Sequence, residues 1–239
     1  MLRCASTRFS IAGSVQKHRR HLILLESKLS AEAWPKRIEQ SQHILADYHK
    51  VIEPFNSKEF AKLVVSVAHP GATNTPHEKP THEALVFPEN IRLSDIAPAE
   101  VPFVANALLE EKVDIESLKQ IVTVTPLSGN HVFVCAHANR DFRCACAGPK
   151  LIEWMESDTP DWNVYACSHF GGHRYAGNCI VQPDGEWYGH VNSREALQQI
   201  HKAIKDKKPI VPDLWRGRIG LSKDDQLEAY NNEISSCEQ

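Results

Sequence analysis

Two cysteines and two histidines stand at a spacing that suits metal ligation. Eight residues separate Cys135 from Cys144, twenty-four separate Cys144 from His169, and His173 follows four positions later. Thiolate sulfur and imidazole nitrogen are the donors that zinc and iron–sulfur centres take. A set of two sulfurs and two nitrogens suits both, so these residues predict a metal site and leave the metal open.

The segment that carries the two histidines reads His-Phe-Gly-Gly-His over residues 169–173. Histidines four positions apart would share one face of a helix, but each glycine costs about 1 kcal/mol in a helix relative to alanine. Glycine suits a loop with positive φ or a close backbone approach. We therefore expect a loop that directs both imidazoles at one centre.

The spacing does not decide between zinc and an iron–sulfur cluster. Zinc fingers keep two to four residues between paired cysteines, fewer than the eight found here. Rieske [2Fe–2S] sites resemble a C-x-H paired with a C-x-x-H. This chain has C-x-H twice, at 135–137 and 167–169, and no C-x-x-H. Both zinc and a cluster with two histidine ligands stay open on spacing alone.

Composition narrows the class of protein. The chain has 239 residues, 42% of them hydrophobic and 24% charged, which is typical of a soluble globular protein. No apolar run approaches the ~18 residues of a membrane-spanning helix. A net charge of −3 offers no basic field for nucleic acid. There is no P-loop, G-x-G-x-x-G or G-x-S-x-G, while thirteen histidines and seven cysteines favour metal chemistry.

Residues 1–20 differ from the rest of the chain. They contain five basic residues and several serines, and the first acidic residue is Glu26. This composition is typical of a mitochondrial transit peptide, and no apolar stretch of a secretory signal follows. We expect residues 1–20 to be a mitochondrial targeting segment, for the matrix or the intermembrane space. In that compartment the cysteines are expected to be thiols or metal ligands rather than structural disulfides.

The remaining residues predict an α/β fold of two units, with no internal repeat visible residue by residue. The first unit, 21–120, has expected strands at 21–25, 62–68 and 83–87, helices at 31–49, 104–111 and 115–120, and a polar loop at 71–82. The second, 121–210, has expected strands at 131–136, 163–167, 179–182 and 187–191, and helices at 149–157 and 194–205. A proline–glycine turn at 183–185 joins the last two strands. This order is that of a thioredoxin-like domain, and 211–239 is expected to be a C-terminal extension.

The four candidate ligands and their surroundings resemble the sucrase/ferredoxin-like family. The motif Cys135-x8-Cys144-x24-His169-x-Gly-Gly-His173 is similar to the signature of that family. Residues 140–144 (RDFRC) resemble its Arg-Asp-x-Arg-Cys run, 215–218 (WRGR) with 220–221 its C-terminal segment, and 34–35 (WP) an early landmark. The resemblance covers about residues 22–221. With its transit-like start, the chain is most similar to the mitochondrial branch of the family.

The resemblance implies a thioredoxin-like ferredoxin with a bis-histidinyl [2Fe–2S] cluster. Its ligands would be Cys135 and Cys144 on one iron and His169 and His173 on the other. The residues expected around them, to set the cluster potential by charge, are Arg140, Asp141, Arg143 and Arg174. Cys146 departs from the pattern and could compete as a ligand. We expect Cys167 and Cys179 to be core thiols and His137 to be a solvated loop residue.

The expected function is electron transfer between protein redox partners, without enzymatic activity of its own, without nucleic acid and without a membrane span. Two alternatives stay open. A thiol–disulfide redox protein would normally carry C-x-x-C, which is absent, although Cys144 and Cys146 form a C-x-C. A structural Zn²⁺ site in an interaction module would use the same donors.

Overall fold

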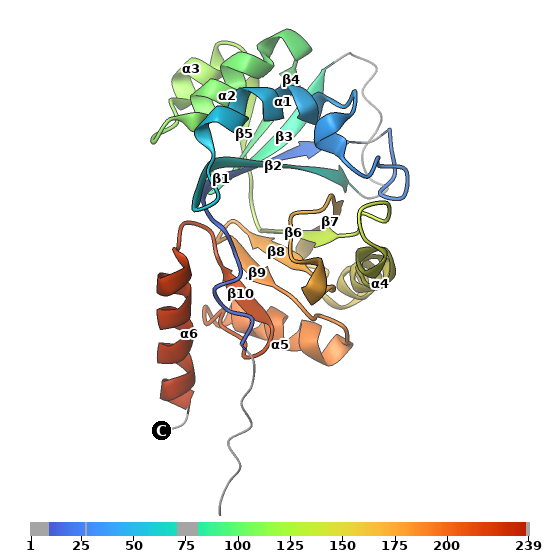
Figure 1. Cartoon of the computed structure of the whole chain (residues 1–239), viewed down its shortest axis with the longest axis vertical. Helices are drawn as coiled ribbons and strands as arrows, with labels where there is room; N and C mark the ends of the chain where they lie inside the picture. Colours follow the sequence, from blue (N-terminus) through green and yellow to red (C-terminus); the bar gives the residue numbers. More distant parts are fainter. Residues whose placement is uncertain (1–9, 27, 71–80, 238–239) are drawn as a thin grey trace, which may run out of the picture.

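The computed structural model describes residues 10–26, 28–70 and 81–237. Within them a ten-stranded sheet has the order β10-β9-β8-β6-β7-β2-β1-β3-β4-β5 (Figure 1). The strands are β1 (Lys17–Leu25), β2 (Phe60–Pro70), β3 (His82–Phe87), β4 (Ile91–Ile96), β5 (Thr123–Pro126), β6 (Asn130–Cys135), β7 (Trp162–Cys167), β8 (Cys179–Gln182), β9 (Glu186–Tyr188) and β10 (Trp215–Arg218). The helices are α1 (Ile44–Ile52), α2 (Val101–Leu109), α3 (Ile115–Lys119), α4 (Phe142–Asp158), α5 (Arg194–Lys205) and α6 (Lys223–Cys237). The α/β class is confirmed.

The two halves of the sheet have the same topology. In the N-terminal half (residues 17–126) the strand order is β2-β1-β3-β4-β5, and in the C-terminal half (residues 130–218) it is β7-β6-β8-β9-β10. In each half the first two strands are parallel and flank a helix, and the other three run antiparallel to their neighbours. The C-terminal half therefore has the predicted thioredoxin-like order, and the N-terminal half repeats it without a visible sequence repeat.

The two halves join edge to edge through β2 and β7. These strands run antiparallel, and Ala68 pairs with Cys167 at this seam. The backbone amide of Ser168 donates to the Val67 carbonyl over 2.7 Å, and the Val67 amide donates to the Ser168 hydroxyl over 2.9 Å. The sheet is consequently continuous, so the two predicted units are not separate bodies.

The sheet folds back on itself at the seam and forms four layers. Alternate residues of β1 show this, because Leu22 and Leu24 pack beneath the helices whereas Ile23 packs on the opposite face. Each half has one hydrophobic core beneath its helices. The faces of the sheet that point away from the helices pack against each other and form a third core, in which the Phe87 and Phe133 rings lie 5.8 Å apart. Helices α1–α3 cover the N-terminal half, and α4 and α5 cover the C-terminal half (Figure 1).

The structure corrects the boundaries that we predicted. Residues 17–20 belong to β1, and buried Arg20 pairs with Glu89 over 2.6 Å, so a boundary at residue 20 cuts a folded strand. Residues 1–9 lie outside the described residues, and a targeting role for them stays a prediction. The boundary at 120/121 is also displaced, because β5 pairs with β4. Residues 211–239 include edge strand β10 with fully buried Trp215, so they are not a simple extension.

Two helix predictions were wrong at their starts. Helix α1 begins at Ile44 rather than near 31, because the His43 imidazole caps it by accepting from the Leu45 amide. Helix α4 begins at Phe142 rather than 149, because the Asp141 carboxylate caps its first turn, and Pro149 lies inside the helix. The earlier start brings Cys144 into the first turn of α4. The turn at 183–185 is confirmed between β8 and β9, and most of the predicted loop at 71–82 lies outside the described residues.

Within the described part of the chain, no helix combines the length and the apolar character that a membrane crossing requires.

Candidate metal centre

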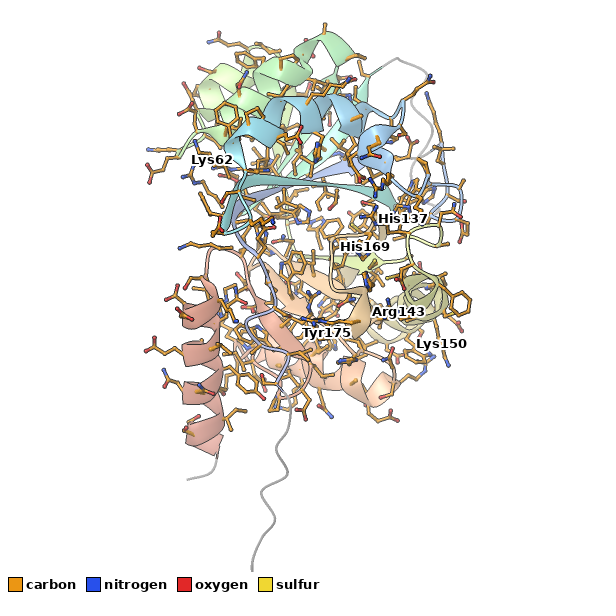
Figure 2. The ribbon with its side chains drawn as sticks, viewed as in Figure 1. Lys62, His137, Arg143, Lys150, His169 and Tyr175 are labelled. Carbon is orange, nitrogen blue, oxygen red and sulfur yellow. The ribbon has the colours of Figure 1, made fainter. Side chains whose placement is uncertain are left out.

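Three of the four predicted ligands come together in the C-terminal half. The Sγ atoms of Cys135 and Cys144 and a ring nitrogen of His169 all lie within 4.8 Å of one another. His169 Nδ1 is 3.7 Å from Cys135 Sγ. Both cysteines are buried with 1% exposure, while His169 is partly exposed at the level where the two halves meet (Figure 2). No other such group of histidine, cysteine or acidic side chains occurs among the described residues.

His173, the fourth predicted ligand, lies next to this group but outside it. Its ring stacks on that of His169 with centroids 5.4 Å apart. Its side chain is 49% exposed, and Nδ1 lies 3.8 Å from an Asp141 carboxylate oxygen. The structure therefore places both imidazoles at one end of the site, with His173 turned toward Asp141.

Local backbone chemistry sets these positions. Cys135 ends β6, Cys144 lies in the first turn of α4, and the two approach closely because Gly148 lets α4 pack on the strand end. A Cβ at Gly148 would lie 2.4 Å from the Cys135 carbonyl oxygen. Beyond β7 the chain turns through Gly171 (φ 97°) and Gly172 (φ 76°). The predicted glycine loop with positive φ is confirmed.

The two thiols differ in acidity. A hydrogen bond from Cys135 to Cys144 lowers the pKa of Cys144 to about 5, and His169 contributes in the same direction. The same hydrogen bond, together with burial, raises the pKa of Cys135 well above its usual range. The first turn of α4 further favours negative charge at Cys144. The contact thus favours the thiolate form at Cys144 and the thiol form at Cys135.

His137 is buried, so our expectation of a solvated loop residue was wrong. Its Nε2–H donates to the Pro35 carbonyl over 3.0 Å, and its Nδ1 accepts from the His169 backbone amide over 3.3 Å. Burial lowers the pKa of His137, which keeps this imidazole neutral. His137 therefore fixes the His169 backbone against the N-terminal half (Figure 2). The contact joins segments about a hundred residues apart, which no local pattern indicates.

The charged residues predicted around the site form surface pairs. Arg143 holds the Asp141 carboxylate through two hydrogen bonds of 2.9 Å, and this contact keeps the pKa of Asp141 far below its usual range. Arg140 donates to the Lys36 carbonyl and lies 3.7 Å from Glu39. The Arg174 guanidinium lies over the Tyr175 ring at 4.7 Å.

The other described cysteines do not join the site. Cys146 is exposed, because residues two positions apart on α4 point in different directions. Cys167 and Cys179 are fully buried. Burial raises the pKa of Cys179 to about 12 and that of Cys167 further still. These two are core thiols, as predicted.

Arg216 is a residue that the motif analysis did not assign to the site. Its side chain is buried with 2% exposure under the glycine loop, and a Cβ at Gly172 would lie 2.3 Å from its Nη2. Its Nη1 donates to Asn178 Oδ1 over 3.0 Å. Asn178 in turn donates to the Gly172 carbonyl and accepts, through its own carbonyl, from the Cys135 amide. The sequence signal was the position of Arg216 within the family-like segment 215–218.

The donor set fits a soft or borderline metal. Two sulfurs and one imidazole nitrogen converge, with a second imidazole adjacent. Thiolate and imidazole donors in this number suit Zn²⁺ or a [2Fe–2S] cluster, whereas Mg²⁺ and Ca²⁺ prefer oxygen. The described residues therefore form a candidate metal centre whose metal is not fixed by geometry.

Comparison with known proteins agrees with the motif. Residues 11–217 match the family described as sucrase/ferredoxin-like. "Altered inheritance of mitochondria protein 32" of Debaryomyces hansenii is 24% identical over 84% of this chain and 82% of its own length. The protein of the same name in Meyerozyma guilliermondii is 26% identical over 84% and 80%. That of Clavispora lusitaniae is 35% identical over 48% of this chain and 43% of its own length.

No solved structure matches the chain. The family match nevertheless spans both halves of the sheet and all four candidate ligands, from residue 11 to residue 217. The chain belongs to the sucrase/ferredoxin-like family.

Proposed function

We propose that the chain is an electron carrier that binds one [2Fe–2S] cluster, with Cys135 and Cys144 on one iron and His169 and His173 on the other. The convergence of two thiols and an imidazole, with a second imidazole stacked beside it, carries this proposal. Membership of a ferredoxin-like family supports it. When bound, such a cluster accepts and returns one electron.

The protein's own groups determine how that electron would be held. Two neutral imidazoles in place of two thiolates leave less negative charge, so we expect a potential above the roughly −400 mV of all-cysteine plant-type ferredoxins. Added negative charge on the cluster makes protonation of an imidazole ligand more favourable. The potential should therefore fall as pH rises.

The exposed side of the centre is its histidine side, which makes it the expected contact with redox partners. The thiols are buried, whereas His173 and its neighbours Arg174 and Phe142 are exposed, Phe142 to 79%. A protein partner that docks here would contact an imidazole rather than a thiolate. We propose a role in electron transfer rather than an enzymatic activity.

We further propose a mitochondrial location, because the relatives carry mitochondria in their names and residues 1–9 are basic and free of acidic residues. The decisive observation would be the distribution of the full-length chain, tagged at its C-terminus, between purified mitochondria and cytosol.

Anaerobic purification followed by iron, sulfide and zinc analysis tests the cluster. About two iron and two sulfide per chain, with a visible band and a reduced S = 1/2 signal, are expected of a [2Fe–2S] protein. His169→Cys should shift the visible spectrum, while His190→Cys, away from the ligand group, should not. One zinc per chain without a visible band would reject the electron-carrier proposal in favour of a structural site.

The low pKa of Cys144 favours a second candidate for the metal-free chain, thiol–disulfide exchange. The Cys144 thiolate would attack a disulfide of a partner protein and release one partner thiol. Cys135 would then displace the second partner thiol and leave a Cys135–Cys144 disulfide. Absence of bound metal together with reduction of a peptide disulfide by the thiol form would favour this alternative.

A further inference from the structure

Arg216 is a buried cation whose hydrogen-bond partners are all neutral. Its Nε donates to the Ser14 hydroxyl over 3.2 Å, and its Nη2 donates to the Ser14 carbonyl over 3.3 Å. Its Nη1 donates to Asn178 and, over 3.4 Å, to the Gly171 carbonyl. The guanidinium also lies over the rings of Tyr175 and Trp187, at 5.0 and 5.5 Å.

Other arginines of the sheet are compensated by glutamates. Arg20 pairs with Glu89, and Arg218 pairs with Glu186 over 2.6 Å. For Arg216, no carboxylate of the described residues lies within ion-pair distance. Burial of an unpaired charge is strongly unfavourable, so such a cation requires negative charge from another source.

The metal centre is the candidate source of that charge. Cys135 lies one hydrogen-bonded residue away from Arg216, because Asn178 accepts from the Arg216 guanidinium and from the Cys135 amide. Burial lowers the pKa of Arg216 to about 10, and negative charge at Tyr175, Cys135 or Cys179 would oppose this shift. Of these three, Cys135 is a candidate ligand, and a metal-bound cysteine is a thiolate.

A β-bulge delivers Arg216 to this place. Trp215 pairs with Tyr188 and Gly217 pairs with Trp187, so Arg216 is an extra residue in β10. A bulge re-aims a side chain and is frequent beside functional sites. In the N-terminal half, β5 pairs with β4 in an unbroken register and has no counterpart of Arg216. Among the described residues, a buried arginine without a carboxylate partner therefore occurs only in the half that contains the thiols.

We propose that Arg216 is the internal countercharge of the metal centre, which holds the Cys135 backbone and the glycine loop in place through Asn178 and whose positive charge favours a more negative centre. The proposal rests on a metal centre at these residues, as argued above. It predicts that loss of the Arg216 side chain displaces these ligand segments and weakens metal binding. It also predicts that loss of Arg216 disfavours the reduced, more negative centre.

The test compares Arg216→Met, which removes the charge, with Arg216→Lys, which keeps it. Lys150→Met removes an exposed cation that also lies over an aromatic ring, that of Trp154 at 5.0 Å, and is the matched control. Zn²⁺ serves as a redox-inactive probe of the thiolate site. We expect Arg216→Met to weaken Zn²⁺ binding by about 10- to 100-fold, as loss of a group around a metal ligand typically does. Arg216→Lys should stay within a few-fold of the parent, and Lys150→Met should bind as the parent does.

Unfolding of metal-free and metal-loaded protein separates the countercharge from a packing role. Arg216→Met should destabilise the loaded form more than the metal-free form, whereas a packing role would destabilise both equally. In protein loaded with iron, the reduction potential at fixed pH should become more negative in Arg216→Met and change much less in Lys150→Met. If Arg216→Met does not fold, Arg216→Gln, which keeps a hydrogen-bond donor, takes its place.

Equal metal affinity and equal potential in the parent and the neutral variants would overturn the inference. Failure of the electron-carrier proposal looks different. A protein that binds only zinc, but loses zinc affinity in Arg216→Met, would keep the role of Arg216 in positioning the ligands and reject the redox role.

Discussion

The two halves of this protein share one topology, but among the described residues only the C-terminal half brings candidate metal ligands together. Each half has a proline, Pro88 or Pro183, directly after the third strand of the half in chain order. The residues before these prolines, Phe87 and Gln182, pair with His21 and His131, so these two histidines occupy equivalent positions. Counting four residues along each strand makes Leu25 equivalent to Cys135. The helix caps align in the same way, so that Ala46 in α1 is equivalent to Cys144 in α4.

The third ligand position follows the same rule. Leu25 pairs with Ala68 as Cys135 pairs with Cys167, so Pro70 in the N-terminal half is equivalent to His169. Leucine, alanine and proline offer no side-chain donor. The N-terminal half instead has a cavity of about 500 Å³ at this place, lined in part by Glu26, His43 and His82.

The difference teaches that topology provides the place and a few side chains provide the chemistry. In both halves the end of the first strand lies beside the start of the first helix. In the N-terminal half, His43 Nε2–H donates to Glu26 over 3.1 Å and Tyr48 hydrogen-bonds to His82 over 3.0 Å. Those groups satisfy one another, whereas the thiols of the C-terminal half remain available to a metal.

Loss of one thiol should have the largest effect. Cys144→Ser is expected to abolish stoichiometric metal binding, because it removes the thiolate of the site, and to leave the fold intact. Cys146→Ser, two residues away on the exposed face of α4, is the matched control and should bind metal as the parent does. Metal analysis after gel filtration decides; full occupancy of the Cys144→Ser protein would remove Cys144 from the ligand set.

Gly172→Ala should have the next largest effect. A Cβ there meets buried Arg216 and the backbone has φ 76°, so we expect a loss of about 1–3 kcal/mol of unfolding free energy. Gly171 also has a positive φ, but a Cβ there would have no atom within 4 Å. Gly171→Ala should therefore lower the unfolding free energy by less. Denaturant titration of the metal-free variants would show this order, and equal losses would mean that contact with Arg216 contributes nothing.

Two titratable groups, one in each half, should respond to pH in opposite directions. Burial lowers the pKa of His82 to about 4, so its contribution to stability is lost as pH falls from about 6.5 to about 4. Burial raises the pKa of Glu186 to about 7, so its contribution is lost as pH rises from about 4.5 to about 7. Unfolding of the metal-free protein should become less acid-sensitive in His82→Gln and more acid-sensitive in Glu186→Gln. A change of the same sign in both variants would contradict the assignment.

The smallest effect is expected for the exposed pair beside the centre. Arg143→Ala removes a surface contact with Asp141 and should lower the unfolding free energy by roughly 0.2–1 kcal/mol. The loss should shrink at 1 M salt because exposed charges are screened. Thermal unfolding at low and high salt checks this. A loss above 2 kcal/mol would show that the pair holds the first turn of α4 more firmly than its exposure implies.

The sequence indicated the candidate ligands because their donors are rare side chains at a specific spacing, and the structure brings three of the four together. It also indicated most strands, since β-branched runs between turns mark them. The repeat was not visible, because Leu25 and Cys135 occupy equivalent positions without any chemical likeness. Pro149 was read as a helix start because proline favours first turns, whereas the Asp141 cap began α4 seven residues earlier. Buried His137 and Arg216 depend on partners in distant segments, which local patterns do not reveal.

The seam between β2 and β7 has one further consequence. Ala68 and Cys167 are equivalent residues, and they pair with each other. An approximate two-fold axis therefore passes between them, as in an isologous homodimer, where the same patch of both subunits forms the contact. A homodimer must carry two identical sites. A single chain with this internal symmetry is free to differ at one of them, and here one copy keeps the metal ligands while the other supplies Pro35 to hold His137 beside them.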